Sequence, residues 1–315
     1  MSLHVYAVKD ALEALLGTGN YLDSIIPADI TISFICYLED MSREAIRSVK
    51  SIQEIGEELG LRYEIIIATP EASAARIRPL NKIECVTIVP IEGRASGKGK
   101  RVGTQKSRSK YLVFFDPATA YPVSVADIIH SYIIMDTKKM LLSSFAMMPS
   151  EALREVGGWR DLVSGEDSDL FSRFAVAYGI IAYPLVGMRP YGLSLVPRDR
   201  RIAALRDFIT GLNLSASDVR TLSRMRHNPG RFRLGVAYLL SRMRLVKPYR
   251  FDRNNYIVVM ESVFESLVLR DYEKLRGAVL PPRLVLRNEE VSYLKKKSKV
   301  FNDVHETLEK IIEVE

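Results

Sequence analysis

Four acidic side chains lie close together in the middle of the chain, at Asp161, Glu166, Asp167 and Asp169. A run with helical spacing of apolar residues follows, from Leu170 to Tyr178, and Gly179 ends it. Glu166 and Asp167 are therefore expected at the start of a helix, where the helix dipole favours an ionised carboxylate. An ionised carboxylate there can take a proton from an acceptor hydroxyl as a general base. The same cluster also suits a purely structural cap of the helix.

A further carboxylate, Asp116, directly follows the apolar run 111–115 and precedes Pro117. In open α/β sheets, ligands bind beyond the carboxyl ends of the strands. Asp116 is thus expected to contact either a nucleotide ribose or a divalent cation that bridges a diphosphate, because hard cations prefer carboxylate and phosphate oxygens. An aspartate that only forms a turn before proline is the alternative.

A glycine-rich basic segment, residues 93–103, opens onto a predicted helix over 98–107. Free backbone N–H groups and the side chains of Lys98, Lys100 and Arg101 would attract a phosphate there. The spacing of the glycines matches neither the P-loop nor the dinucleotide fingerprint, so a solvated loop is equally compatible with it.

The elements that must position these residues follow a βαβ rhythm. Near-continuous apolar strands indicate a mostly parallel sheet with helices on both faces, and hence an α/β fold. The strand ends then place the site near Tyr37, Thr69, Pro90 and Asp116. Strands are predicted at 31–37, 62–68, 84–89, 110–115 and 140–147, and helices at 43–59, 98–107, 123–135 and 149–156.

The chain divides into three predicted regions: an N-terminal accessory helix within 1–28, an α/β domain over 29–190, and a helical region over 191–315. In the third region, helices are predicted at 202–212, 217–226, 232–245, 254–275 and 289–312. Positive charge concentrates there, since residues 189–253 contain fifteen Arg or Lys against four Asp. Such a patch fits a phosphate-bearing partner: nucleic acid, anionic lipid headgroups or a diphosphate substrate.

The amino-acid composition limits the classes of function that the chain can have. With 315 residues and 47% hydrophobic content, the chain can form a sizeable core. No apolar run reaches the ~18 residues of a membrane span, so a cytoplasmic location is expected. Cys36 and Cys85 both fall in β-like runs, where we expect small buried thiols rather than a disulfide or a metal site. The four histidines lack ligand spacing.

Taken in order, these motifs resemble the glycosyltransferases of the large family 2 group, which have the GT-A fold. The resemblance covers about residues 30–190. Val156-Gly157-Gly158-Trp159, followed by Gly165-Glu166-Asp167-Ser168-Asp169-Leu170, is similar to the family's GGF…ED-x-DL pattern. The run 111–119 is similar to the strand end that carries the family's DxD motif.

The resemblance implies roles for particular residues. Asp167 would be the general base of an inverting displacement, and Glu166 and Asp169 would orient or bind the acceptor. The first aspartate of DxD maps to Asp116, but the second, the usual direct metal ligand, maps to Ala118. The resemblance thus implies Mg²⁺ or Mn²⁺ as the cofactor, with Asp116 as a ligand and without the family's second carboxylate. Further expected substrate contacts are Trp159, Lys98, Arg101, Thr69 and Tyr37.

The predicted function is that of an inverting glycosyltransferase, which moves a sugar from a UDP-, GDP- or dTDP-linked donor to an acceptor hydroxyl. The alternative is a catalytically silent protein of the same fold that binds a sugar nucleotide or a partner subunit. Residues 232–244 suit either a helix at an anionic membrane surface, which would fit a lipid-linked acceptor and a peripheral place on the inner face of the membrane, or an ordinary core-packed helix. Nucleic acid ranks last, since no binding motif is present.

Overall fold

A seven-stranded sheet forms the centre of the computed structural model, which describes residues 31–183, 190–225, 228–243, 253–275 and 283–315. Its strand order is β3-β2-β1-β4-β6-β5-β7, and every neighbouring pair is parallel except the two that β6 makes. The strands are β1 (Thr31–Tyr37), β2 (Arg62–Pro70), β3 (Val86–Ile91), β4 (Tyr111–Phe115), β5 (Met140–Leu142), β6 (Phe145–Pro149) and β7 (Ile180–Ala182).

Alternating apolar side chains explain why β1 lies in the middle of the sheet. Ile32, Phe34 and Cys36 face one core, Ile35 faces the other, and all four are fully buried. A strand that is apolar on both faces must be covered by helices on both sides. Because β1 pairs with β2 on one side and β4 on the other, the strand order reverses between β1 and β4. Ligands of open α/β sheets bind beyond the strand ends at such a position.

Helices cover both faces of the sheet. One core packs β1 against α2 (Arg43–Leu59) and α5 (Val125–Met135). On the other face, the second core includes residues of α6 (Ser150–Glu155) and α7 (Glu166–Ala177), while α4 (Ser96–Lys106) contacts β1 and β2. The predicted α/β fold, a mostly parallel sheet with helices on both faces, is confirmed by this arrangement.

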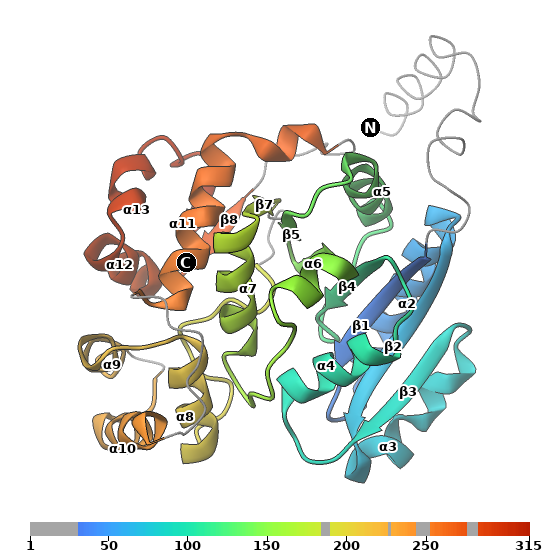
Figure 1. Ribbon diagram of the computed structural model, residues 1–315, viewed down its shortest axis with the longest axis horizontal. Coiled ribbons are helices and arrows are strands. Elements are labelled where there is room, and N and C mark those ends of the chain that lie inside the picture. Colours follow the sequence, from blue (N-terminus) through green and yellow to red (C-terminus); the bar gives the residue numbers. More distant parts are fainter. Residues whose placement is uncertain (1–30, 184–189, 226–227, 244–252, 276–282) are drawn as a thin grey trace.

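The chain after residue 190 is mainly helical, as predicted, and Figure 1 shows these helices on the far side of α7 from β1–β3. Its apolar residues, including Phe208, Leu234 and Phe264, belong to the same core cluster as Ile35 and Ile66 of the sheet. The remaining elements are α3 (Glu71–Ile77), η1 (Arg78–Lys82), α8 (Ile202–Gly211), α9 (Ala216–Leu222), α10 (Arg231–Arg242), α11 (Asn255–Val268), η2 (Asp271–Lys274), β8 (Leu284–Leu286), α12 (Asn288–Lys297), α13 (Lys299–Val304) and β9 (Ile312–Val314).

Two predicted elements are each split in the structure. The strand expected over 140–147 is a pair of antiparallel strands, β5 and β6, because the chain turns at Ser143, whose N–H donates to the Phe145 carbonyl at 2.7 Å. The helix expected over 289–312 breaks at Ser298, whose hydroxyl accepts from Phe301 N–H at 3.1 Å and starts α13. The chain then ends as β9, parallel to β8.

Other differences are smaller. The helix expected over 254–275 ends at Val268, and the chain reverses at Arg270, whose φ is +53°. Cys36 is buried as expected, but Cys85 is exposed, because it lies in a left-handed turn (φ +63°) just before β3. The predicted N-terminal helix lies outside the described residues, and the division at residue 190 stays a prediction. In the described part of the chain, no helix is long and apolar enough to cross a membrane.

Candidate functional site

The carboxylates of Glu166 and Asp167 lie at the start of α7. Gly165 precedes them with φ +80°, a conformation that favours glycine, and turns the chain into the helix. Both carboxylates are buried, each with about 2% of the residue exposed. Buried carboxylates need charged or hydrogen-bonding partners, so their surroundings decide what they can do.

Two cations compensate this carboxylate pair. The Lys100 ammonium group, on α4, lies 2.5 Å from Asp167 Oδ1 and 3.1 Å from Glu166 Oε1. The Arg198 guanidinium lies farther away, 3.7 Å from Asp167 Oδ2 and 3.8 Å from Glu166 Oε1. The Ser96 hydroxyl donates to Glu166 Oε1 at 2.6 Å. The pair is therefore fixed by short contacts to α4 and a looser one to Arg198.

The two carboxyl groups have different proton affinities. Burial would raise the pKa of Glu166, but Lys100 and Arg198 outweigh burial and lower that pKa to about 2. Burial raises the pKa of Asp167 above its ordinary value of 3.8, and the neighbouring charge of Glu166 raises it further. A proton that reaches the pair is thus held by Asp167, which is the property that a general base needs.

Two aromatic rings enclose Lys100. Its Nζ lies 4.7 Å from the ring centroid of Trp159 and 5.1 Å from that of Tyr191. Trp159 also packs edge-on against Phe114, with 4.9 Å between ring centroids. Cation–π contacts of this kind strengthen when water is excluded. Trp159 is 3% exposed, so it supports Lys100 from beneath and does not form part of the pocket surface.

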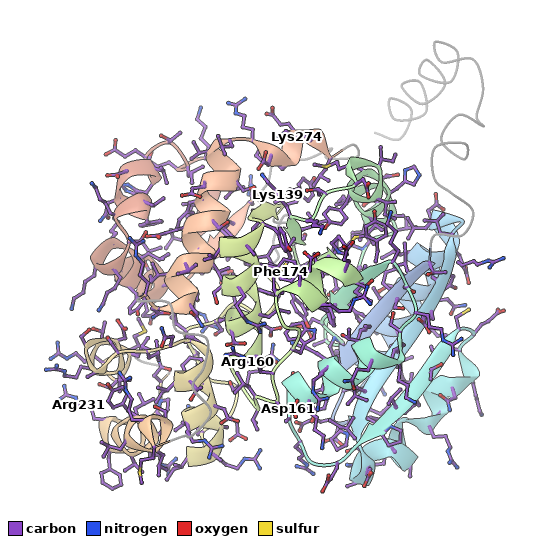
Figure 2. All side chains as sticks on the ribbon, in the orientation of Figure 1. Lys139, Arg160, Asp161, Phe174, Arg231 and Lys274 are labelled. Atoms are coloured by element: carbon purple, nitrogen blue, oxygen red, sulfur yellow. The ribbon has the colours of Figure 1, made fainter. Side chains whose placement is uncertain are left out.

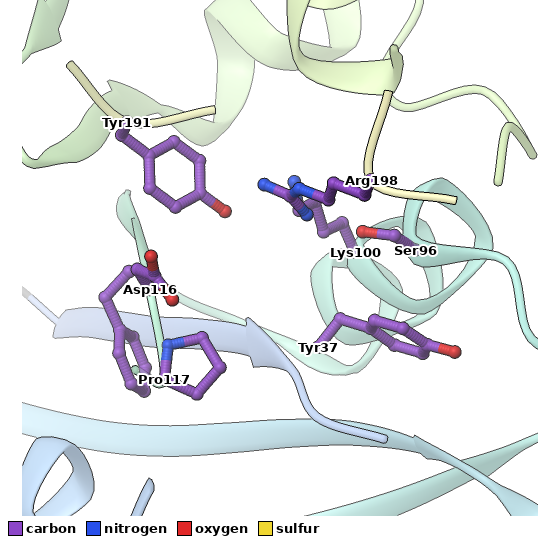
Figure 3. A pocket seen from close by; sticks show the side chains of 8 residues that line it. Tyr37, Ser96, Lys100, Asp116, Pro117, Tyr191 and Arg198 are labelled. Atoms are coloured by element: carbon purple, nitrogen blue, oxygen red, sulfur yellow. The ribbon is translucent and has the colours of Figure 1, made fainter. Parts of the chain in front are cut away.

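A pocket of about 270 Å³ opens above this cluster. It lies at the carboxyl ends of β1 and β4, where the strand order reverses, and Figure 3 shows Arg198 and Lys100 on one side with Asp116 and Pro117 on the other. Small-molecule sites usually span roughly 300–1,000 Å³, so the pocket lies just below that range and has room for part of a ligand rather than for a large whole one. Its lining residues are Tyr37, Ser96, Lys100, Phe115, Asp116, Pro117, Tyr191 and Arg198.

Glycines allow the backbone to approach the site closely. A Cβ on Gly99 would lie 2.5 Å from the Tyr37 ring, and one on Gly97 would lie 2.0 Å from the Arg160 carbonyl oxygen. The Gly97 N–H itself donates to the Leu162 carbonyl at 3.0 Å. These glycines lie within α4 and pack it against β1 and against the loop 156–165 that precedes α7, here called the acidic loop. The helix begins at Ser96, earlier than predicted.

Asp116 lies at the pocket, but its surroundings do not form a metal site. Its Oδ1 accepts a hydrogen bond from Ala118 N–H at 2.9 Å, which directs that oxygen to its own turn. Ala118 offers no ligand atom in its side chain, and hard divalent cations require several oxygen ligands. Among the described residues there is no group of three or more His, Cys, Asp or Glu that could hold a metal ion. The residues present therefore do not fit the metal that the resemblance implies.

Of the other predicted site residues, Tyr37 alone lines the pocket. Asp169 is buried, and its two oxygens pair with Arg160 at 2.8 Å and Arg173 at 2.7 Å, so it anchors the acidic loop to α7. Figure 2 shows Arg160 near the lower end of α7 and Asp161 farther toward α4. Outside the pocket lie Lys98, which bonds to the Glu92 carbonyl at 3.0 Å, Arg101, paired with Asp161 at 2.7 Å, and Thr69, fully buried.

Five pocket residues did not emerge from the sequence as site residues: Ser96, Phe115, Pro117, Tyr191 and Arg198. Arg198 belongs to the basic stretch after residue 189, and that excess of charge was the available signal. Tyr191 carried no comparable signal. It reaches the site because its N–H donates to the Ser143 carbonyl at 2.7 Å, which holds the chain after β7 against the turn between β5 and β6.

Comparison with known proteins gives structural likeness alone. No family model matches the chain, and no curated protein matches it. A crystal structure of residues 1–349 of TarS from S. aureus is similar, with a TM-score of 0.43 and 10% identity, over 88% of this chain and 92% of that one. The 4-diphosphocytidyl-2C-methyl-D-erythritol synthase of Anaerococcus prevotii is similar over 51% of this chain and 89% of its own, with a TM-score of 0.39 and 9% identity. No site residue or activity is transferred from either protein.

Proposed function

We propose that this protein is an inverting glycosyltransferase that uses a nucleotide sugar as its donor. The observation that carries the proposal is that two features lie together at the carboxyl ends of β1 and β4. The first is a pocket lined by cations, at the place where the strand order reverses. The second is the buried carboxylate pair next to it, in which Asp167 has the higher proton affinity. Titratable groups with separated pKa values in such a position are typical of acid–base sites.

In the proposed reaction, the donor's diphosphate lies in the pocket and the acceptor hydroxyl approaches Asp167. The acceptor oxygen attacks the anomeric carbon from the face opposite the diphosphate while its proton passes to Asp167. The bond between the anomeric carbon and the diphosphate oxygen breaks, and the nucleoside diphosphate leaves with the bonding electrons. The Arg198 side chain must shift to admit the acceptor, since it lines the pocket, lies 3.7 Å from Asp167 Oδ2 and is itself exposed.

The test is a transfer assay with UDP-, GDP- and dTDP-sugars on the full chain, with the anomeric configuration of the product read by NMR. Asp167→Asn should lower turnover by about 100-fold or more, because general base catalysis contributes roughly 10²–10⁴-fold, and donor affinity should be unchanged. Asp161→Asn, an exposed change in the loop that precedes α7, is the matched control. Donor binding without turnover in the wild type would favour the silent alternative, and absence of any nucleotide-sugar binding would refute the proposal.

We also propose that the acceptor is reached at an anionic membrane surface. The support is α10, which exposes Phe232 by 81%, Leu239 by 64% and Met243 by 76%. This spacing places the three side chains on one stripe of the helix, and the exposed arginines Arg231 and Arg242 flank it. Basic helices with an exposed apolar stripe bind interfaces with anionic lipid. Two copies of this surface would bring like charges together, so a second copy fits it less well.

A further inference from the structure

Arg198 differs from the other charged groups of the site in its exposure. Its side chain is 60% exposed and lines the pocket across from Asp116 (Figure 3). Its closest carboxylate oxygens are 3.7 and 3.8 Å away, and it makes no hydrogen bond to any described residue. The N–H groups of the guanidinium are therefore available to a ligand.

Lys100 cannot take that role equally well. Its side chain is 2% exposed, and its ammonium group is held within 3.1 Å of both Glu166 and Asp167. An ammonium with two carboxylate contacts already compensates the pair, and moving it would leave two buried charges without a close partner. Lys100 is thus the fixed counter-charge, and Arg198 is the cation that can turn toward an incoming anion.

Around Asp116, the residues that the structure describes do not supply the ligands for a divalent cation: Ala118 has no ligand atom in its side chain, and one oxygen of Asp116 is engaged in its own turn. A leaving diphosphate still requires positive charge, because charge that develops in the transition state must be stabilised. A guanidinium can supply it, since its planar fork matches phosphate oxygens in a bidentate geometry.

We propose that Arg198 binds the diphosphate of the donor and supplies the positive charge that a divalent cation would otherwise supply, so that donor binding is independent of metal. The inference rests on the proposed function, because it assigns a residue to the diphosphate of that donor. The inference concerns only how the diphosphate binds, and that binding can be measured without turnover.

The experiment measures binding of inorganic pyrophosphate to the full chain after EDTA treatment, by calorimetry and by the fluorescence of Trp159, the single tryptophan. Wild-type protein should bind pyrophosphate without metal. Arg198→Ala should weaken binding by about tenfold or more, and Arg198→Lys should fall between, because an ammonium lacks the fork. Arg200→Ala, an exposed arginine outside the pocket, is the matched control and should change affinity by less than about twofold.

Several outcomes would overturn the inference. Pyrophosphate affinity that is equal in Arg198→Ala and wild type, with both proteins folded by circular dichroism, removes Arg198 from the site. Binding of pyrophosphate and nucleotide sugars only after Mn²⁺ is added overturns metal independence but leaves the proposed function intact. If neither pyrophosphate nor any nucleotide sugar binds with or without Mn²⁺, the proposed function fails together with the inference.

Discussion

Lys100 is the side chain on which the carboxylate pair depends most closely. It contacts both Glu166 and Asp167, and the rings of Trp159 and Tyr191 keep water from it. A buried ion pair adds little net stability over apolar packing, but the loss of one partner leaves a buried charge uncompensated. The free energy of unfolding should therefore be far more sensitive to Lys100 than to lysines at the surface.

Replacement of Lys100 by methionine tests this dependence. Lys100→Met keeps the aliphatic volume but leaves Glu166 and Asp167 with Arg198 alone, so the free energy of unfolding should fall by about 3–5 kcal/mol. Urea denaturation measures the change. Lys98→Met is the control, since Lys98 pairs with the exposed Glu92 and should contribute under about 1 kcal/mol. Equal losses from the two variants would contradict the assigned role of Lys100.

Residue types alone indicate that an acidic loop exists, but they do not assign a task to each acid. Glu166, Asp167 and Asp169 are equally suited to a site by sequence, yet Asp169 pairs with two arginines while the other two lie under the pocket. The difference comes from helical phase and from the positions of the arginines, since Arg160 lies in the preceding loop and Arg173 lies one turn along α7. Lys98 and Lys100 separate in the same way, because residues two apart on a helix point to different faces.

The segment that follows β7 supplies a wall of the site. Tyr191 and Arg198 line the pocket, and between them Gly192 lies against Asp167. Gly192 has φ +66°, and a Cβ there would be 2.4 Å from Asp167 Cγ. A glycine at this position satisfies two requirements, the left-handed backbone and the space for the carboxylate.

Gly192→Ala should therefore harm catalysis more than stability. Both Gly192→Ala and the control Gly60→Ala place a Cβ on a left-handed backbone, at a cost of roughly 1–2 kcal/mol each. A Cβ on Gly60 would meet nothing within 4 Å, so only Gly192→Ala displaces Asp167. With the donor identified by the transfer assay, Gly192→Ala should lower turnover by about tenfold or more, since a small misplacement of a reacting group costs up to ~10²-fold. Wild-type turnover in Gly192→Ala would show that Asp167 tolerates displacement.

At the scale of elements, the sequence predicts the bounds of helices and strands best where buried residues follow a continuous pattern. β1, β4 and α2 match their expected ranges closely, because apolar runs and an N-capping serine are local signals. The split between β5 and β6 and the break at Ser298 were missed, since a two-residue turn and a single capping serine interrupt patterns that otherwise continue. Local sequence signals could not predict that Tyr191 and Arg198 form a wall of the site, because their position depends on where β7 pairs in the sheet.

Over the whole molecule, two charged surfaces serve different partners in the proposed function. The pocket lies at the strand edge between β1 and β4, whereas α10 lies among the C-terminal helices, and Figure 2 shows Arg231 at the outer edge of the molecule. If α10 contacts the membrane, the pocket entrance is thus a separate part of the molecular surface. Binding of lipid and of donor should be separable by mutation.

Vesicle binding tests the surface on α10. Wild-type protein should sediment with phosphatidylcholine vesicles that contain phosphatidylglycerol, less so as salt rises, because anionic lipid attracts nearby arginines by about 1 kcal/mol each. The double variant Phe232→Ser and Met243→Ser should lose this binding, whereas Leu269→Ser, which removes an equally exposed apolar side chain elsewhere, should keep it. Self-association that the double variant abolishes, without vesicle binding in the wild type, would assign the stripe to a second copy instead.

The loose contact between Arg198 and the buried carboxylates has one more consequence. A guanidinium drawn to an anion in the pocket leaves Glu166 and Asp167 with Lys100 and the neutral ring of Tyr191, and a carboxyl that loses a nearby positive charge gains proton affinity. Occupancy of the pocket and protonation of the pair are then reciprocal events. The proton affinity of the base would therefore be highest when the donor is bound, once there is a sugar to transfer.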